Sequence, residues 1–271
     1  MSPAPEPPPI LALDSVEVVY KRAITAVQGI SLTVQKGQIV AVLGTNGAGK
    51  TTILRAISGF LGLDDARVTE GSILFKGRAI ENGRPDRIAR AGLALVPERE
   101  KVFPNLTVAE NLVIGVSAAS ANDRRQRHAF VMECFPRLAR LTGRTAGLLS
   151  GGERQMLAIA TALVMHPEVL LIDELSLGLA PVVVSELTET IKLIRRDLGL
   201  TIVLVEQSAP VALSIADHGY VIENGRVVLD GSADRLRDHP DIKDFYLGQS
   251  RGDRRSYREV KQYRRSRRWY G

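Results

Sequence analysis

A glycine-rich stretch between an apolar segment and an amphipathic one constrains the fold of this chain more than any other feature. Residues 44–52, Gly-Thr-Asn-Gly-Ala-Gly-Lys-Thr-Thr, fit the pattern GxxxxGK[ST] at every position. The apolar residues 38–43 before it predict a buried strand, and residues 51–58 after it place Ile53, Leu54 and Ile57 on one helical face. The sequence therefore predicts a strand, a phosphate-binding loop and a helix in succession.

This loop has the chemistry that a nucleotide requires. Glycines let the backbone curl so that successive N–H groups point inward, and the start of the helix adds free N–H groups and a partial positive charge. Lys50 would reach the β- and γ-phosphates of ATP, and the Thr51 hydroxyl would bind Mg²⁺. The alternative is a glycine-rich turn that binds nothing. The residues assigned to ATP are Gly44, Asn46, Gly47, Ala48, Gly49, Lys50, Thr51 and Thr52.

Two carboxylates end a second apolar strand. Residues 168–172 are followed by Asp173 and Glu174, about 120 residues after the loop, which is the order expected in a nucleotide-hydrolysing site. Asp173 would hold Mg²⁺, and Glu174 would polarise the attacking water as the general base. A strand that merely ends in acids is the alternative.

The composition and the charge distribution restrict the kind of protein this chain forms and the surfaces it binds. The 271 residues are 45% hydrophobic, which is enough for a sizeable core, and the single cysteine, Cys134, excludes an internal disulfide. No run approaches the ~18 apolar residues of a membrane span. Residues 251–271 hold nine cations against two acids, a net +7, so this tail accounts for the positive net charge of +6 of the whole chain. Such a tail suits an anionic membrane surface or nucleic acid, or is simply solvated.

Periodicity and turn residues predict the order of the remaining elements. We expect a disordered N-terminus over residues 1–9, one domain over residues 10–248 with a helical subdomain at about 105–165, and a flexible basic tail over 249–271. The strands are expected at 11–20, 29–34, 71–76, 92–96, 168–172, 201–205, 219–223 and 226–229. The helices are expected at 85–91, 108–116, 123–135, 153–165, 183–198 and 241–247.

The stretch Leu149-Ser-Gly-Gly-Glu153-Arg-Gln opens one of these helices, with Ser150 at the N-cap. Together with the phosphate loop and the Asp-Glu strand, it resembles the signature motif of the ATP-binding subunits of ABC transporters. The resemblance covers roughly residues 10–248 and implies an α/β fold: a RecA-like P-loop NTPase core, an antiparallel β subdomain and an inserted α-helical subdomain. It also implies that two subunits pair head to tail, so that Ser150, Gly151, Gly152 and Glu153 face ATP bound by the partner. Tyr20 lies where this family stacks an aromatic ring on adenine, although a core tyrosine is the alternative.

Departures from the usual ABC pattern point to one subfamily. Glu98 replaces a glutamine and is still able to reach Mg²⁺, Ala180 replaces an aspartate, and Gln207 replaces a histidine that senses the γ-phosphate. With these residues the chain resembles the second ATPase subunit of high-affinity branched-chain amino-acid importers and their relatives for urea, short amides and aromatic acids. Glu174 and Gln207 are the expected catalytic residues, and Thr51, Asp173 and Glu98 the expected Mg²⁺ ligands.

The resemblance implies an ATPase motor on the cytoplasmic face of the inner membrane. Its expected partners are a second, non-identical ATPase, two permease subunits and, indirectly, an extracytoplasmic solute-binding protein. Two alternatives are a soluble ABC-type ATPase that acts on nucleic acid and a non-hydrolysing scaffold. The single phosphate loop and the lack of long extra domains count against the first, so no nucleic-acid partner is expected. The intact Lys50, Asp173 and Glu174 count against the second.

Overall fold

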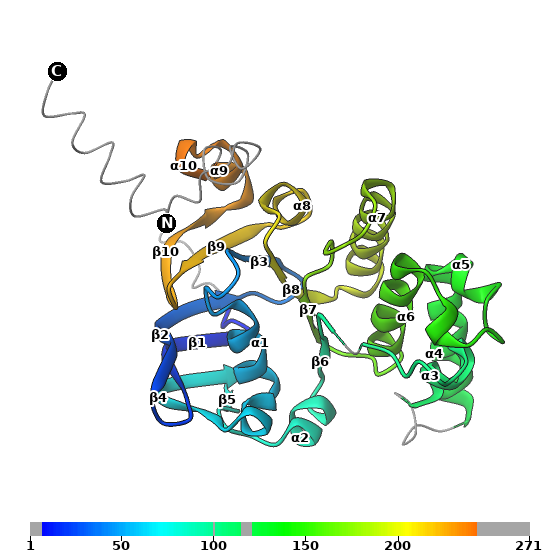
Figure 1. Cartoon of the computed structure of the whole chain (residues 1–271), viewed down its shortest axis with the longest axis horizontal. Helices are drawn as coiled ribbons and strands as arrows, with labels where there is room; N and C mark the ends of the chain where they lie inside the picture. The colour runs from blue at the N-terminus through cyan, green and yellow to red at the C-terminus, as the bar shows by residue number, and fades with distance from the viewer. Residues whose placement is uncertain (1–6, 100, 115–120, 243–271) are drawn as a thin grey trace, which may run out of the picture.

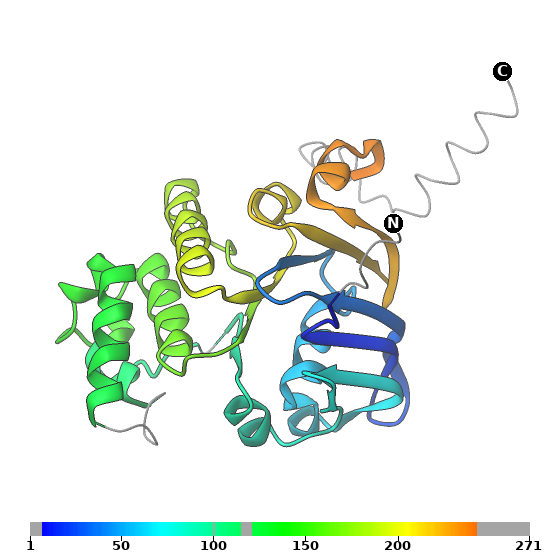
Figure 2. The ribbon, with the colours of Figure 1, turned by 180° about the vertical axis from the view of Figure 1, so that it is seen from behind.

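The structure is a computed structural model that describes residues 7–99, 101–114 and 121–242. The first six residues, the basic tail and most of the helix expected over residues 241–247 lie outside the described residues. Figure 1 and Figure 2 show the described fold from opposite sides.

Two β-sheets form the framework. A four-stranded antiparallel sheet has the order β2-β1-β4-β5, and a six-stranded sheet has the order β10-β9-β3-β8-β7-β6. Within the larger sheet β3 pairs in parallel with both β8 and β9, and only β10 runs antiparallel to its neighbour. The strands are β1 (Leu11–Tyr20), β2 (Ile24–Val34), β3 (Ile39–Gly44), β4 (Ala66–Phe75), β5 (Arg78–Ala79), β6 (Leu93–Val96), β7 (Val169–Asp173), β8 (Thr201–Glu206), β9 (His218–Glu223) and β10 (Arg226–Ser232).

The strand before the phosphate loop lies between two hydrophobic cores. Alternate side chains of β3 point to opposite faces of the sheet. Ile39, Ala41 and Leu43 enter one core, and Val40 and Val42 enter the other. The second core also contains the buried side of α1 (Lys50–Ser58) and residues of the antiparallel sheet, so α1 packs between the two sheets. This packing fixes both ends of the phosphate loop.

The helices between β6 and β7 gather at one end of the molecule, away from the antiparallel sheet, in both views (Figure 1, Figure 2). They are α3 (Val108–Ile114), α4 (Ala121–Cys134), α5 (Pro136–Ala139) and α6 (Gly151–Leu163), with a 3₁₀ turn at Ala146–Leu148. The others are α2 (Pro85–Arg90), α7 (Pro181–Leu198), α8 (Ala209–Leu213), α9 (Ala233–Asp238) and α10 (Pro240–Ile242), with a 3₁₀ turn at Phe60–Asp64. Among the described residues, none of these helices combines the length and the apolar character needed to traverse a lipid bilayer.

The predicted elements are largely confirmed, with three kinds of difference. The strand over residues 11–20 is confirmed at both ends, whereas β2 starts at Ile24 rather than at residue 29. The segment 62–68 is a 3₁₀ turn followed by the first residues of β4, which therefore begins five residues earlier than expected. The helices α5, α8 and α9 were missed because segments of four to six residues are too short to show a helical period.

Candidate nucleotide-binding site

The phosphate loop turns through two glycines with left-handed backbones. Gly47 has a φ of 81° and Gly49 a φ of 103°. A Cβ on Gly49 would lie 2.8 Å from the carbonyl oxygen of Ala26, so no other residue fits there. The following helix α1 begins without a side-chain cap. Its first N–H groups have no partner within the helix and are available to an anion.

The turn of the β9–β10 hairpin is hydrogen-bonded to this loop. Its Asn-Gly turn places Gly225 so that its N–H donates to the carbonyl oxygen of Ala48 at 2.9 Å. The carbonyl oxygen of Gly225 accepts a hydrogen bond from the Gln28 N–H at 2.7 Å. The hairpin thus holds the loop through the Ala48 carbonyl group, and within the loop the Ala48 N–H donates to the carbonyl oxygen of Thr45 at 3.1 Å.

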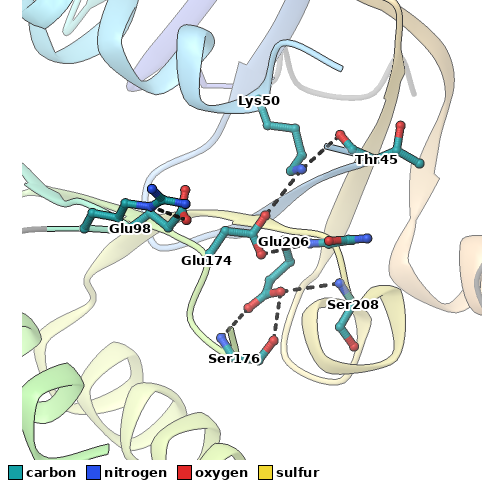
Figure 3. Close-up of polar contacts among 9 residues, drawn as sticks. Thr45, Lys50, Glu98, Glu174, Ser176, Glu206 and Ser208 are labelled. Atoms are coloured by element: carbon teal, nitrogen blue, oxygen red, sulfur yellow. Dashed lines mark hydrogen bonds and ion pairs between the residues drawn. The ribbon is translucent and has the colours of Figure 1, made fainter. Parts of the chain in front are cut away.

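Lys50 carries its charge into the centre of the site. Its side chain is only 6% exposed and extends from the start of α1 toward the ends of the strands (Figure 3). The ammonium donates to the carbonyl oxygen of Thr45 at 3.2 Å and lies 3.3 Å from Oε1 of Glu174. Glu174 is therefore the counter-ion of Lys50.

Asp173 offers a buried oxygen that suits a cation. It is the last residue of β7 and is 3% exposed, and its Oδ1 atom has no hydrogen-bond partner. Burial raises the pKa of Asp173 to about 6, against a hydrogen bond with the Thr51 side chain that lowers it. A desolvated carboxylate beside a hydroxyl matches the oxygen ligands that Mg²⁺ prefers. No group of three His, Cys, Asp or Glu residues that could hold a metal occurs in the described ranges. Mg²⁺ is commonly held by one or two carboxylates together with waters and phosphate oxygens.

We expect Asp173→Asn to raise the melting temperature of the nucleotide-free, Mg²⁺-free protein at pH 8. The raised pKa means that ionised Asp173 costs the folded state about 3 kcal/mol, a cost that is complete above pH 6 and decreases toward pH 4. Asparagine keeps the shape without the charge, so the gain should be about 5 °C at pH 8 and about half of that at pH 5. Thermal unfolding of the variant beside Asp234→Asn, an exposed control, tests this. An equal gain at both pH values would contradict the electrostatic cause.

Glu174 is held in a strained conformation directly after β7. Its φ of 55° is unusual for a residue with a side chain and costs about 1–3 kcal/mol, which the contacts around it must offset. Its N–H donates to the carbonyl oxygen of Val205 at 3.0 Å, and its Oε2 accepts from the Gln207 N–H at 3.3 Å. Strand β8 and the residue that follows it thus orient the carboxylate, with its Oε1 beside Lys50.

The other predicted site residues on this side of the molecule are close to the loop. Tyr20 ends β1, and its hydroxyl lies 3.2 Å from the hydroxyl of Thr52. Glu98 pairs with Arg99 at 3.2 Å, and its charge contributes to the raised pKa of Asp173. Gln207 follows β8, beside Glu174. The structure therefore brings together Tyr20, the loop, Glu98, Asp173, Glu174 and Gln207.

The signature residues lie elsewhere, at the start of α6. Ser150 is the N-cap, as predicted, and forms a capping box with Glu153. The Glu153 carboxylate accepts from the Ser150 N–H and hydroxyl, both at 2.8 Å, and the backbone bond lowers the pKa of Glu153. No hydrogen bond among the described residues joins this capping box to the phosphate loop. The Ser150 N–H and hydroxyl and the Glu153 N–H, three of the donors expected to face a phosphate, thus have partners within the chain.

Sequence reasoning missed Glu206 as a site residue. It ends β8 with 0% exposure and accepts hydrogen bonds from Ser176 and Ser208 (Figure 3). The sequence signal that could have identified Glu206 is its position directly after the apolar residues 202–205 of a buried strand. Lys101, whose ammonium contacts the buried amide oxygen of Gln155 on α6, was also missed.

Comparisons with known proteins agree with this geometry. A family model described as "ABC transporter" matches residues 27–176. The chain is 41% identical, over 88% of its length and all of the relative, to the "High-affinity branched-chain amino acid transport ATP-binding protein BraG" of Pseudomonas aeruginosa. It is 38% identical, over 81% of its length and 91% of the relative, to the "Probable branched-chain amino acid transport ATP-binding protein LivF" of Archaeoglobus fulgidus.

Solved structures confirm the expected fold class. An ATP-binding cassette of an ABC transporter in its ADP conformation matches 89% of this chain and 99% of its own, with a TM-score of 0.76 and 26% identity. The cbiO1 protein of Clostridium perfringens, part of an ABC transporter complex, matches 90% and 97% with a TM-score of 0.76 and 25% identity. The chain therefore belongs to the ABC transporter family as an ATP-binding subunit, an ATPase whose hydrolysis of ATP is coupled to transport.

Proposed function

We propose that this chain is the ATP-hydrolysing motor of an importer for branched-chain amino acids or chemically related solutes. The observation that carries the proposal is the convergence of Lys50, Asp173 and Glu174 at one end of neighbouring strands. It occurs in a chain that is 41% identical to BraG, a protein named for branched-chain amino-acid transport. Lys50, Asp173 and Glu174 support ATP hydrolysis, and the similarity to BraG supports the class of solute.

Each residue has a distinct role in the proposed reaction. Lys50 and the N–H groups of residues 44–52 hold the phosphates of ATP. Asp173 and Thr51, with Glu98 nearby, hold Mg²⁺, which when bound neutralises charge on the phosphate oxygens. Glu174 accepts a proton from the water that attacks the γ-phosphorus, while the bond from that phosphorus to the oxygen of ADP breaks.

Two further residues complete the proposed site. The Gln207 amide donates a hydrogen bond to the γ-phosphate but cannot carry a positive charge. Tyr20 stacks on the adenine, a contact worth about 1–3 kcal/mol by analogy with other base–aromatic stacking. The link from its hydroxyl to Thr52 would hold the ring beside the phosphate loop.

The separation of the two motifs supports pairing between chains. Residues 150–153 make no hydrogen bond to the phosphate loop among the described residues, so a second chain would supply the signature for each site. We propose that this second chain is a similar but non-identical ATPase. Both would bind two permease subunits at the cytoplasmic face of the membrane, and a solute-binding protein would act from the other side. The relatives reported above are transport proteins and lend no support to a function on nucleic acid.

Isolation of the intact complex tests this proposal. A tagged version of this chain, purified from its native membrane in mild detergent, should bring with it a second ATPase chain and two permease subunits, as measured by native mass spectrometry. In liposomes, the solute-binding protein loaded with leucine should stimulate ATP hydrolysis more than the same protein without solute. A complex with only this ATPase would make the motor homodimeric. Stimulation by nucleic acid in place of solute would contradict the transport function.

A further inference from the structure

The most heavily hydrogen-bonded acid in the site has no role in the reaction outlined above. Glu206 ends β8 and is fully buried, one residue before Gln207. Strand β8 pairs in parallel with β7, with Asp173 opposite Val205. The loops that follow the two strands therefore leave the sheet side by side, one with Glu174 and the other with Gln207.

Both oxygens of Glu206 are used to join these loops. Oε1 accepts from the Ser176 N–H at 2.7 Å, and Oε2 accepts from the Ser176 hydroxyl at 3.0 Å and the Ser208 N–H at 3.4 Å. Figure 3 shows the carboxylate between the two serines, below Glu174. We propose that Glu206 is a positioning residue for hydrolysis, which holds the loop after Glu174 against the loop that carries Gln207.

The electrostatics of Glu206 and Glu174 indicate that Glu206 is present for a functional reason. Burial first, and then the nearby charge of Glu174, raise the pKa of Glu206 to about 7, while hydrogen bonds from Ser176 and Ser208 act in the opposite direction. A second buried acid beside Glu174 is costly. An apolar side chain would leave the Ser176 and Ser208 N–H groups without an acceptor, and an amide would offer one oxygen to three donors. The arrangement is explained if an acceptor with two oxygens is needed to hold both loops at once.

Replacement of Glu206 is expected to lower the rate of ATP hydrolysis with little effect on the affinity for ATP. Glu206 contacts neither Lys50 nor the phosphate loop in any described hydrogen bond, so ATP should bind normally without it. The direction of the Glu174 carboxylate should change, and displacement of a catalytic group by about 1 Å can cost a hundredfold in rate. The inference rests on the proposed hydrolytic role of Glu174, and the test below separates the two.

The test compares variants in the purified full-length complex. We expect kcat for ATP hydrolysis to fall about tenfold in Glu206→Gln and about a hundredfold in Glu206→Ala, with the Kd for Mg-ATP changed less than threefold in both. Ser176→Ala should also lower kcat, and the double variant Ser176→Ala/Glu206→Gln should be no slower than Glu206→Gln alone. The matched control is Thr201→Val, which removes a buried hydrogen bond with Gly37 at the opposite end of the same strand.

The possible outcomes are distinguishable. If the wild-type complex does not hydrolyse ATP, the proposed function fails. If it does, and Glu206→Gln is as fast as wild type or as Thr201→Val at equal thermal stability, the positioning role is wrong and the hydrolytic role stands. The positioning role is also wrong if Mg-ATP binding falls as much as kcat, or if the effects of Ser176→Ala and Glu206→Gln multiply.

Discussion

Glu174→Gln will bind ATP as tightly as the wild-type protein and will not turn it over. Glutamine has the same shape but cannot take a proton from water, so kcat should fall about 10²- to 10⁴-fold. The amide also removes the negative charge 3.3 Å from Lys50, which leaves this ammonium more available to phosphate. In the presence of Mg-ATP we expect a stable closed pair of ATPase subunits, measured by size-exclusion chromatography and by bound nucleotide per chain.

The control for this variant is the same chemical change at the start of the same strand. Glu168 precedes β7, pairs with Lys76 and is half-exposed, so Glu168→Gln should keep wild-type kinetics. Hydrolysis by Glu174→Gln at the wild-type rate would show that another group, or no group, activates the water. Loss of ATP binding in this variant would instead mean that Glu174 supports the loop rather than the reaction.

Lys50→Ala should lose most of the affinity for ATP. The ammonium is the one cation whose hydrogen bonds place it against the phosphate loop in the described part of the chain. Hydrogen bonds to a charged group are worth about 1.5–3 kcal/mol, which corresponds to a Kd about 10- to 100-fold higher. Isothermal titration with Mg-ATP measures this, and Lys76→Ala, which removes an exposed lysine beside Phe75, is the control.

The Lys50 variant also leaves Glu174 as a buried charge without its counter-ion, which by itself destabilises the protein. The double variant Lys50→Ala/Glu174→Gln removes both charges, so its melting temperature should return toward that of the wild type while ATP binding stays weak. Recovery of ATP binding together with stability would show that Lys50 acts through the fold and not through phosphate.

The phosphate loop was predictable because its requirements are local. The two left-handed glycines and the helix after them are adjacent in the sequence, and so are Asp173 and Glu174 at the end of an apolar strand. The N-cap at Ser150 was predictable for the same reason, since its partner Glu153 lies one helical turn away. The same Ser-x-x-Glu spacing is that of a capping box, so the contact of the Glu153 carboxylate with the Ser150 donors was also within reach of the sequence.

The role of Glu206 was not predictable because it depends on the register of two strands. Ser176 is 30 positions away, and only the pairing of Asp173 with Val205 brings their loops together. A shift of the pairing by one residue would point Glu206 to the opposite face of the sheet. In the same way, the contact of Gly225 with the phosphate loop depends on where the β9–β10 hairpin meets β2.

The order of the strands has a consequence for synthesis of this protein on the ribosome. All six residues of β3 are buried, yet its two neighbours in the sheet begin only at Thr201 and His218. While the intervening helices and β7 are being made, a nascent chain therefore carries an apolar strand with both edges unpaired. Unpaired apolar strands are the segments through which incomplete chains aggregate. The same strand that positions the phosphate loop in the finished protein is thus exposed to aggregation during translation until β8 emerges.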